Sequence, residues 1–206
     1  MVSTGECVTT IITMAFCAPS GKGKGSMYAL TNLRTKRLLL RPFTFKDAAD
    51  VLAYASDPEW SRFLPVPNPY TLYDAEEFIA KSILSSRDQE HGLAIELGGR
   101  VIGGIGLRLE QPIAVGSLPY SLAHDHWNQG LTTDAAHAVI DWGFTDFGLE
   151  KVYSWADVEN VGSWRVMEKI GMTREGTFRS HGVNRGMRQD FHYYGILRSE
   201  WKALNA

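Results

Sequence analysis

The sequence has few cysteines, and none of its apolar runs is long enough to cross a bilayer. Cys7 and Cys17 both lie among the first twenty of 206 residues, which is typical of a reducing compartment and argues against a disulfide framework. A membrane-spanning helix needs about 20 consecutive apolar residues. We therefore predict a cytoplasmic protein that has no membrane partner.

The chain also lacks an excess of charge of either sign. Lys and Arg number 21 and Asp and Glu number 23, which gives a formal net charge of -2 at pH 7. Binding to a nucleic-acid backbone depends on a basic field, and this sequence does not carry one. We predict no nucleic-acid partner.

The first 32 residues differ from the rest. The apolar run VTTIITMAFCAPS (8–20) follows Glu6, whereas a secretory signal has positive charge there and a longer core. SGKGKGS (20–26) lacks the spacer of a phosphate loop and is typical of a linker. We predict a flexible, dispensable tail over 1–32, with Met27 as an alternative start, followed by a single domain over 33–206.

From Leu33 onward, strand and helix patterns alternate. The glycine pair at 98 and 99 predicts a hairpin, and Gly148 is placed to end a long helix. The helix at 46–56 is expected to bury the face formed by Ala49, Leu52, Ala53 and Ser56. Strands are predicted at 37–43, 91–97, 100–110, 117–124, 151–157, 171–182 and 187–197, and helices at 46–56, 71–87, 131–148, 160–171 and 198–204. This is a mixed α/β domain.

A glycine precedes the long helix in WNQGLTTDA (127–135). A helix N-terminus exposes unpaired N–H groups and concentrates positive charge, so it suits an anion such as phosphate. Gly130 leaves the backbone open to such an anion, and Asn128, Gln129, Thr132 and Thr133 can add donors. The alternative is that Gly130 only permits a tight turn between strand and helix.

A second helix start lies in ENVGSWRVMEKIGM (159–172). Asn160 suits the N-cap and Gly171 the end, and apolar residues recur at 161, 164, 167 and 170. Together with TKRLLLRPFTFKDAADVLAYASDPE (35–59), EGTFR (175–179) and RQDFHYYGILRSEW (188–201), these motifs resemble the GNAT superfamily of N-acetyltransferases, in particular its RimJ and RimL branch.

The resemblance implies a central, mostly antiparallel, twisted sheet of about seven strands with helices on both faces. Acetyl-CoA would bind where strands four and five splay apart, and no metal is implied. The main chain around Leu122 and His124 would bind the pantetheine arm, which Asn160 would also face. The pyrophosphate and its surroundings would contact the loop and helix start, namely Trp127, Asn128, Gln129, Gly130, Leu131, Thr132 and Thr133.

The resemblance leaves the catalytic groups less defined. Many relatives have a tyrosine acid where this chain has Met167, so Ser163 is the candidate that contacts the cofactor and protonates the departing thiolate. Alternatively, Ser163 only satisfies an N–H group of the first helical turn. Other relatives carry a glutamate base where Trp155 stands here, and Asp157, His124, Asp125 or a water remain open as substitutes.

Without a dedicated base, a weakly basic amine is the easier acceptor, so we predict acetylation of a protein or peptide α-amine. Two alternatives remain open. The acceptor could be a small amine, such as a polyamine or an aminoglycoside, or the protein could be an acyl-CoA-binding module without turnover. The oligomeric state is expected to be monomer or homodimer.

Two other groups could have functions of their own. His124, Asp125 and His126 could begin a metal site if they lie on an extended segment, although no third ligand is evident nearby. Five aromatic residues are interpreted as core rather than as an acceptor pocket: Trp155, Trp164, Phe178, Tyr193 and Tyr194.

Overall fold

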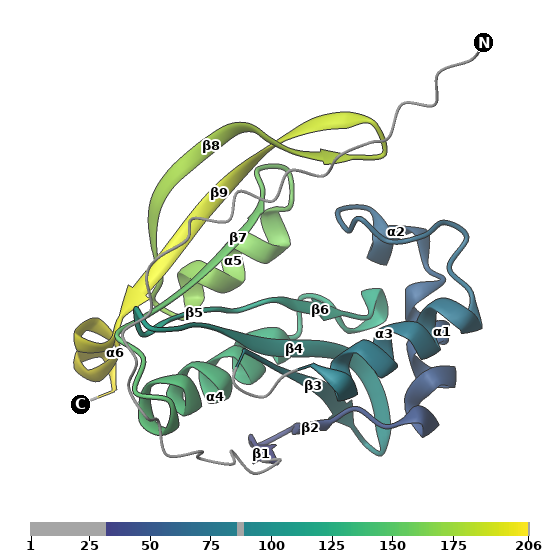
Figure 1. Cartoon of the computed structure of the whole chain (residues 1–206), viewed down its shortest axis with the longest axis horizontal. Helices are drawn as coiled ribbons and strands as arrows, with labels where there is room; N and C mark the ends of the chain where they lie inside the picture. Colours follow the sequence, from purple (N-terminus) through teal and green to yellow (C-terminus); the bar gives the residue numbers. More distant parts are fainter. Residues whose placement is uncertain (1–31, 86–88, 206) are drawn as a thin grey trace.

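The computed structural model describes residues 32–85 and 89–205, and the two cysteines and the predicted tail up to residue 31 lie outside this part (Figure 1). The elements are β1 (Leu33–Arg34), β2 (Leu39–Pro42), η1 (Phe45–Asp47), α1 (Ala48–Ala55), α2 (Pro58–Ser61), α3 (Leu72–Leu84), β3 (Glu90–Leu97), β4 (Arg100–Glu110), β5 (Val115–Ser117), β6 (Tyr120–Leu122), η2 (His124–His126), α4 (Leu131–Asp146), β7 (Lys151–Asp157), α5 (Val161–Lys169), β8 (Thr173–Asn184), β9 (Met187–Leu197) and α6 (Arg198–Leu204).

The strands form one sheet in the order β1-β2-β3-β4-β5-β7-β9-β8, and β6 also pairs with β4. Neighbours are antiparallel except β5 and β7, which confirms the mixed, mostly antiparallel sheet. The sheet has nine strands rather than about seven. One extra strand is the short β1, and the other is β5, which lies mostly before the strand predicted at 117–124 and shares only Ser117 with it, whereas β6 lies within it.

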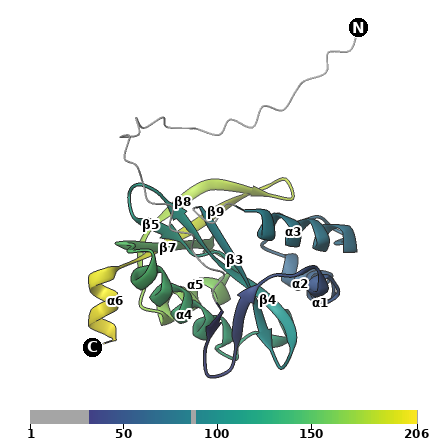
Figure 2. The same cartoon turned by 60° about the horizontal axis from the view of Figure 1, so that its bottom comes forward.

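Helices cover both faces of the sheet, as predicted, with α1 and α3 on one side and α4 and α5 on the other (Figures 1 and 2). On the first face, Phe43 meets Phe78 of α3 with ring centroids 5.2 Å apart. On the second face, a Cβ atom at Gly143 of α4 would lie 3.2 Å from Leu107 of β4, so this helix packs closely on the strand. The two faces share one hydrophobic core.

The predicted buried face of α1 was wrong. Val51, Tyr54 and their neighbours Ala48 and Ala55 are buried, whereas Ala49 is exposed. Small residues occur on all sides of this helix, so the helical period alone does not decide which face is buried. The larger Val51 and Tyr54 bury more apolar area and therefore take the core side.

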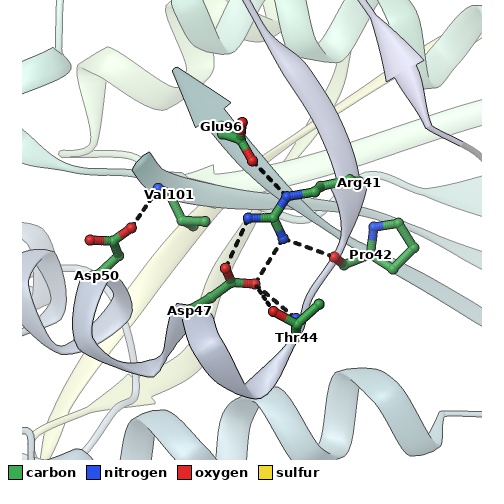
Figure 3. A network of polar contacts seen from close by, with 7 residues as sticks. All are labelled: Arg41, Pro42, Thr44, Asp47, Asp50, Glu96 and Val101. Atoms are coloured by element: carbon green, nitrogen blue, oxygen red, sulfur yellow. Dashed lines mark hydrogen bonds and ion pairs between the residues drawn. The ribbon is translucent and has the colours of Figure 1, made fainter. Parts of the chain in front are cut away.

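An ion-pair network joins β2, η1 and β3 (Figure 3). The Arg41 guanidinium donates to both carboxylate oxygens of Asp47 at 2.8 Å and to Glu96 at 2.6 Å. Asp47 also accepts the Thr44 N–H at 2.8 Å. Asp50, one turn later, accepts the Val101 N–H of β4 at 2.9 Å. These bonds fix the start of α1 on the sheet.

The β8–β9 hairpin reaches from the far end of the sheet toward α2 (Figure 1). Near its tip, the Asn184 side chain donates to the Arg62 carbonyl at 3.1 Å, and Arg185 donates to the Ser61 hydroxyl at 3.0 Å. We call this contact the tip bridge. It ties the last strands of the chain to its first helices.

Candidate active site

Strands β5 and β7 run parallel for three residues and then separate. The Leu118 N–H donates to the Tyr153 carbonyl at 2.9 Å, whereas the Leu118 carbonyl accepts the buried Ser154 hydroxyl at 2.8 Å in place of a β7 N–H. The next residue, Pro119, has no N–H to donate. We call this separation of β5 and β7 the fork. Beyond it, β6 pairs with β4, and a gap opens between β6 and β7.

The main chain of β6 presents polar groups to this gap. Pro119 accepts from Gly106 and Ala123 donates to Ile102, so these alternate residues of the segment face β4. Main-chain groups of successive residues in a strand point to opposite sides. The N–H and C=O groups of Tyr120 and Leu122 therefore point away from β4, toward the gap.

Helix α4 begins at the gap. Its N-cap, Gly130, has φ 73° and provides no side-chain cap, so the first N–H groups of a 16-residue helix stay open to a ligand. Asn128 also has positive φ, at 60°, which turns the loop tightly before the helix. An anion is the ligand that such a helix start favours.

Two side chains hold this loop in place. The Trp127 indole N–H donates to the Leu122 carbonyl at 2.7 Å and thus fastens the loop to β6. Arg37 donates to the Gln129 carbonyl and to Asp134 of α4, both at 2.8 Å. These hydrogen bonds fix the loop between β6 and the first turn of α4.

Helix α5 forms the opposite wall. The Asn160 side chain caps it by accepting the Ser163 N–H at 3.2 Å, as the sequence predicted. The Ser163 hydroxyl lies 2.9 Å from the Tyr120 hydroxyl of β6. This contact crosses the gap between the splayed strands.

These walls enclose a cleft of about 790 Å³, which is within the range of sites for sizeable organic ligands. The lining contains three cationic side chains, Arg62, Arg165 and Lys169, one imidazole, His126, and two carboxylates, Glu59 and Glu159. The remaining lining residues are Trp60, Phe63, Leu64, Tyr120, Ser121, Leu122, Trp127, Asn128, Gly130, Leu131, Thr132, Thr133, Asn160, Val161, Gly162, Ser163 and Val166.

The cleft gathers most of the predicted cofactor residues, namely Leu122, Trp127, Asn128, Gly130, Leu131, Thr132, Thr133, Asn160 and Ser163. The other two, His124 and Gln129, are not among its lining residues. The His124 ring pairs with Asp57 at 3.1 Å, and the Gln129 side chain donates to the Asp125 carbonyl at 3.1 Å.

The candidate bases Asp157, His124 and Asp125 are also absent from the described residues that line the cleft. Asp157 is buried and accepts the Glu159 N–H at 2.8 Å. Trp155, at the family's glutamate position, stacks on Tyr193 with centroids 5.6 Å apart. The aromatic interpretation was partly wrong, since Trp155 and Phe178 are 37% and 48% exposed.

Tyr120 was missed by the sequence analysis. It lies two residues before Leu122, and residues i and i+2 of a strand point to the same side. The alternation rule could therefore have added it to the candidate residues of the cleft. Arg165 and Lys169 were missed as well, although they recur at a spacing of four residues on the predicted helix.

His124, Asp125 and His126 form the short η2 turn rather than an extended segment, so the geometry assumed for a metal pair is not present. Across residues 32–85 and 89–205, no cluster of three or more potential metal ligands occurs. In the same part of the chain, no helix has the length and apolar character needed to cross a membrane.

Comparisons with known proteins agree with this architecture. Residues 37–173 match the acetyltransferase (GNAT) domain family. YnaD of Bacillus subtilis (strain 168), an uncharacterised N-acetyltransferase, is 31% identical over 170 residues, which cover 82% of this chain and 99% of YnaD.

Solved structures show the same fold. A GNAT-family acetyltransferase from Bacillus anthracis has 28% identity and a TM-score of 0.75, covering 82% of this chain and 100% of its own. The ribosomal-protein-S5-alanine acetyltransferase of Vibrio fischeri has 17% identity and a TM-score of 0.73, covering 83% and 98%. The forked sheet, the open helix start and the match over residues 37–173 lead to one conclusion: the chain belongs to the GNAT family of N-acetyltransferases.

Proposed function

We propose that this acyltransferase moves the acetyl group of acetyl-CoA directly onto the α-amine of a protein or peptide. The observation that carries the proposal is the fork, where strand main chain and two helix N-termini converge on one cleft. The residues present fit the donor. A diphosphate suits the open N–H groups at Gly130, and the basic side chains Arg165 and Lys169 complement its charge.

The chemistry is acyl transfer from sulfur to nitrogen. We assign to the N–H of Leu122, which points into the gap, the polarisation of the thioester carbonyl and the stabilisation of the negative charge that develops on its oxygen. The Ser163 hydroxyl on the opposite wall is the proton donor that we assign to the departing thiolate. Its N–H already bonds Asn160, so the hydroxyl is not required for capping.

The choice of acceptor rests on the free energy of deprotonation. Neither carboxylate in the cleft wall, Glu59 or Glu159, is buried, so neither is a desolvated general base. A lysine amine with a pKa near 10.4 costs about 4.6 kcal/mol to deprotonate at pH 7, whereas an α-amine near 7.8 costs about 1 kcal/mol. The α-amine is therefore the better nucleophile here.

Release of free thiol from acetyl-CoA at pH 7.5 tests this assignment. The acceptors are a peptide with a free α-amine, the same peptide N-terminally blocked but carrying lysine, and a polyamine. We expect release only with the free α-amine. We also expect Ser163→Ala to lower kcat by about 100-fold, the usual scale of a lost general acid.

Ser199→Ala, at an exposed position of α6, is the matched control and should keep wild-type turnover. Equal or faster turnover of the blocked lysine peptide would contradict the α-amine assignment. Turnover of the polyamine alone would identify a small-amine acetyltransferase. Acetyl-CoA binding without thiol release on any acceptor would indicate a binding module.

A further inference from the structure

The Tyr120 side chain crosses the gap from β6 to the first turn of α5. Its hydroxyl lies 2.9 Å from the Ser163 carbonyl and 2.9 Å from the Ser163 hydroxyl oxygen. Both residues line the cleft, and Tyr120 lies two residues before Leu122 on the same side of the strand. The pair therefore lies beside the position assigned to the thioester.

The two contacts allow two arrangements of the hydroxyl protons. A carbonyl oxygen only accepts, and a phenol has one proton to donate. When Tyr120 donates to the Ser163 carbonyl, the Ser163 hydroxyl donates to the Tyr120 oxygen, and no hydroxyl proton is left for a ligand. When Tyr120 donates to the Ser163 hydroxyl oxygen, the serine proton is free to point into the cleft. A negatively charged sulfur in the cleft favours the second arrangement.

We propose that Tyr120 supplies, through the Ser163 hydroxyl, the proton taken up by the thiolate that leaves acetyl-CoA. This inference rests on the proposed function. As the amine nitrogen bonds to the acetyl carbon and the C–S bond breaks, sulfur takes the Ser163 hydroxyl proton and the serine oxygen takes the Tyr120 proton. The amine loses one proton to water, and water returns one to Tyr120, so charge and protons balance.

Acidity explains why a phenol is needed behind the serine. A phenol has an ordinary pKa of about 10 and a thiol one of about 8.5, whereas an aliphatic alcohol is a far weaker acid. Burial raises the pKa of Tyr120, and its hydrogen bond with Ser163 offsets only part of that rise. Tyr120 thus keeps its proton at neutral pH and gives it up only when negative charge develops on the sulfur beyond Ser163.

The test compares Tyr120→Phe, Ser163→Ala and the double variant in acetyl transfer to the accepted amine. We expect Tyr120→Phe to lower kcat by about 10- to 100-fold, with the Kd for acetyl-CoA changed less than about twofold. The double variant should be no slower than Ser163→Ala, because the two hydroxyls act in series. With an aryl thioester as acetyl donor, whose thiol is more acidic, the defect of Tyr120→Phe should shrink to less than about threefold.

Tyr153→Phe is the matched control, because it removes another partly buried hydroxyl, bonded to Glu110, from outside the cleft lining. Thermal unfolding of each variant shows whether it is folded. An unchanged kcat in folded Tyr120→Phe overturns the relay but leaves the proposed function intact. An equal defect with both thioesters, or a loss confined to acetyl-CoA binding, also overturns it. If the wild-type protein shows no turnover with any amine, the proposed function itself is wrong.

Discussion

At the scale of single residues, Asp47 shows how a buried charge can stabilise a fold. The residue is 5% exposed, and its carboxylate accepts two hydrogen bonds from Arg41 and two from Thr44 (Figure 3). Removing the Asp47 charge leaves the partly buried Arg41 guanidinium with Glu96 as its remaining ion-pair partner. We expect Asp47→Asn to lower the free energy of unfolding by about 3 kcal/mol, measured by urea denaturation. Glu76→Gln, on the exposed side of α3, should leave it unchanged.

The same residue predicts a pH dependence. Burial alone would raise the pKa of Asp47, but hydrogen bonds from Arg41 and Thr44 outweigh it, so this pKa lies below its ordinary value. A carboxyl group with a lowered folded-state pKa stabilises the fold above its unfolded pKa, near 3.9, and this contribution is lost as the pH falls. The stability difference between wild type and Asp47→Asn should therefore shrink below about pH 4. A difference that stays constant down to about pH 2 would argue against this role of the ion pair.

At the scale of elements, the start of α4 depends on Gly130. An alanine there would add left-handed strain of about 1 kcal/mol and would place a methyl group 3.4 Å from Arg37. It would also crowd the N–H groups that we assign to the diphosphate. We expect Gly130→Ala to raise the Kd for acetyl-CoA by about tenfold, the effect of one lost charged hydrogen bond, as measured by calorimetry.

Gly148→Ala is the control for backbone strain. Gly148 also has positive φ, at 65°, but it follows the other end of α4. Both variants should lose similar stability, and only Gly130→Ala should bind acetyl-CoA more weakly. Equal Kd values for the two variants would show that Gly130 serves only the turn.

Local patterns predicted some elements to the residue and others poorly. Lys151–Asp157 and Arg198–Leu204 match their predicted bounds, because alternation and helix propensity act within each segment. The break between β5 and β6 was predictable only in part, because Pro119 interrupts the strand pattern but does not show where β5 and β7 separate. It depends on the Ser154 hydroxyl, which bonds Leu118 from 36 residues away. The Tyr120 and Ser163 pair likewise joins residues 43 apart, so sequence patterns could suggest its members but not their contact.

At the scale of the whole molecule, residues 32–85 and 89–205 contain the core and all the cleft walls described above. A protein that starts at Met27 should therefore keep the unfolding temperature and the thiol-release rate of the full chain. Thermal unfolding and the acetyl-CoA assay check this expectation. A loss of either property would show that the preceding residues contribute to the fold or to the site.

The tip bridge has a consequence for how movements of the hairpin reach the cleft. Asn184 and Arg185 bond the Arg62 carbonyl and the Ser61 hydroxyl, and Arg62 also lines the cleft. A two-stranded hairpin on its own is only marginally stable in water, so these bonds anchor the end of β8 and β9. The hairpin tip and the cleft wall at Arg62 are therefore mechanically coupled, and a displacement of one would be transmitted to the other.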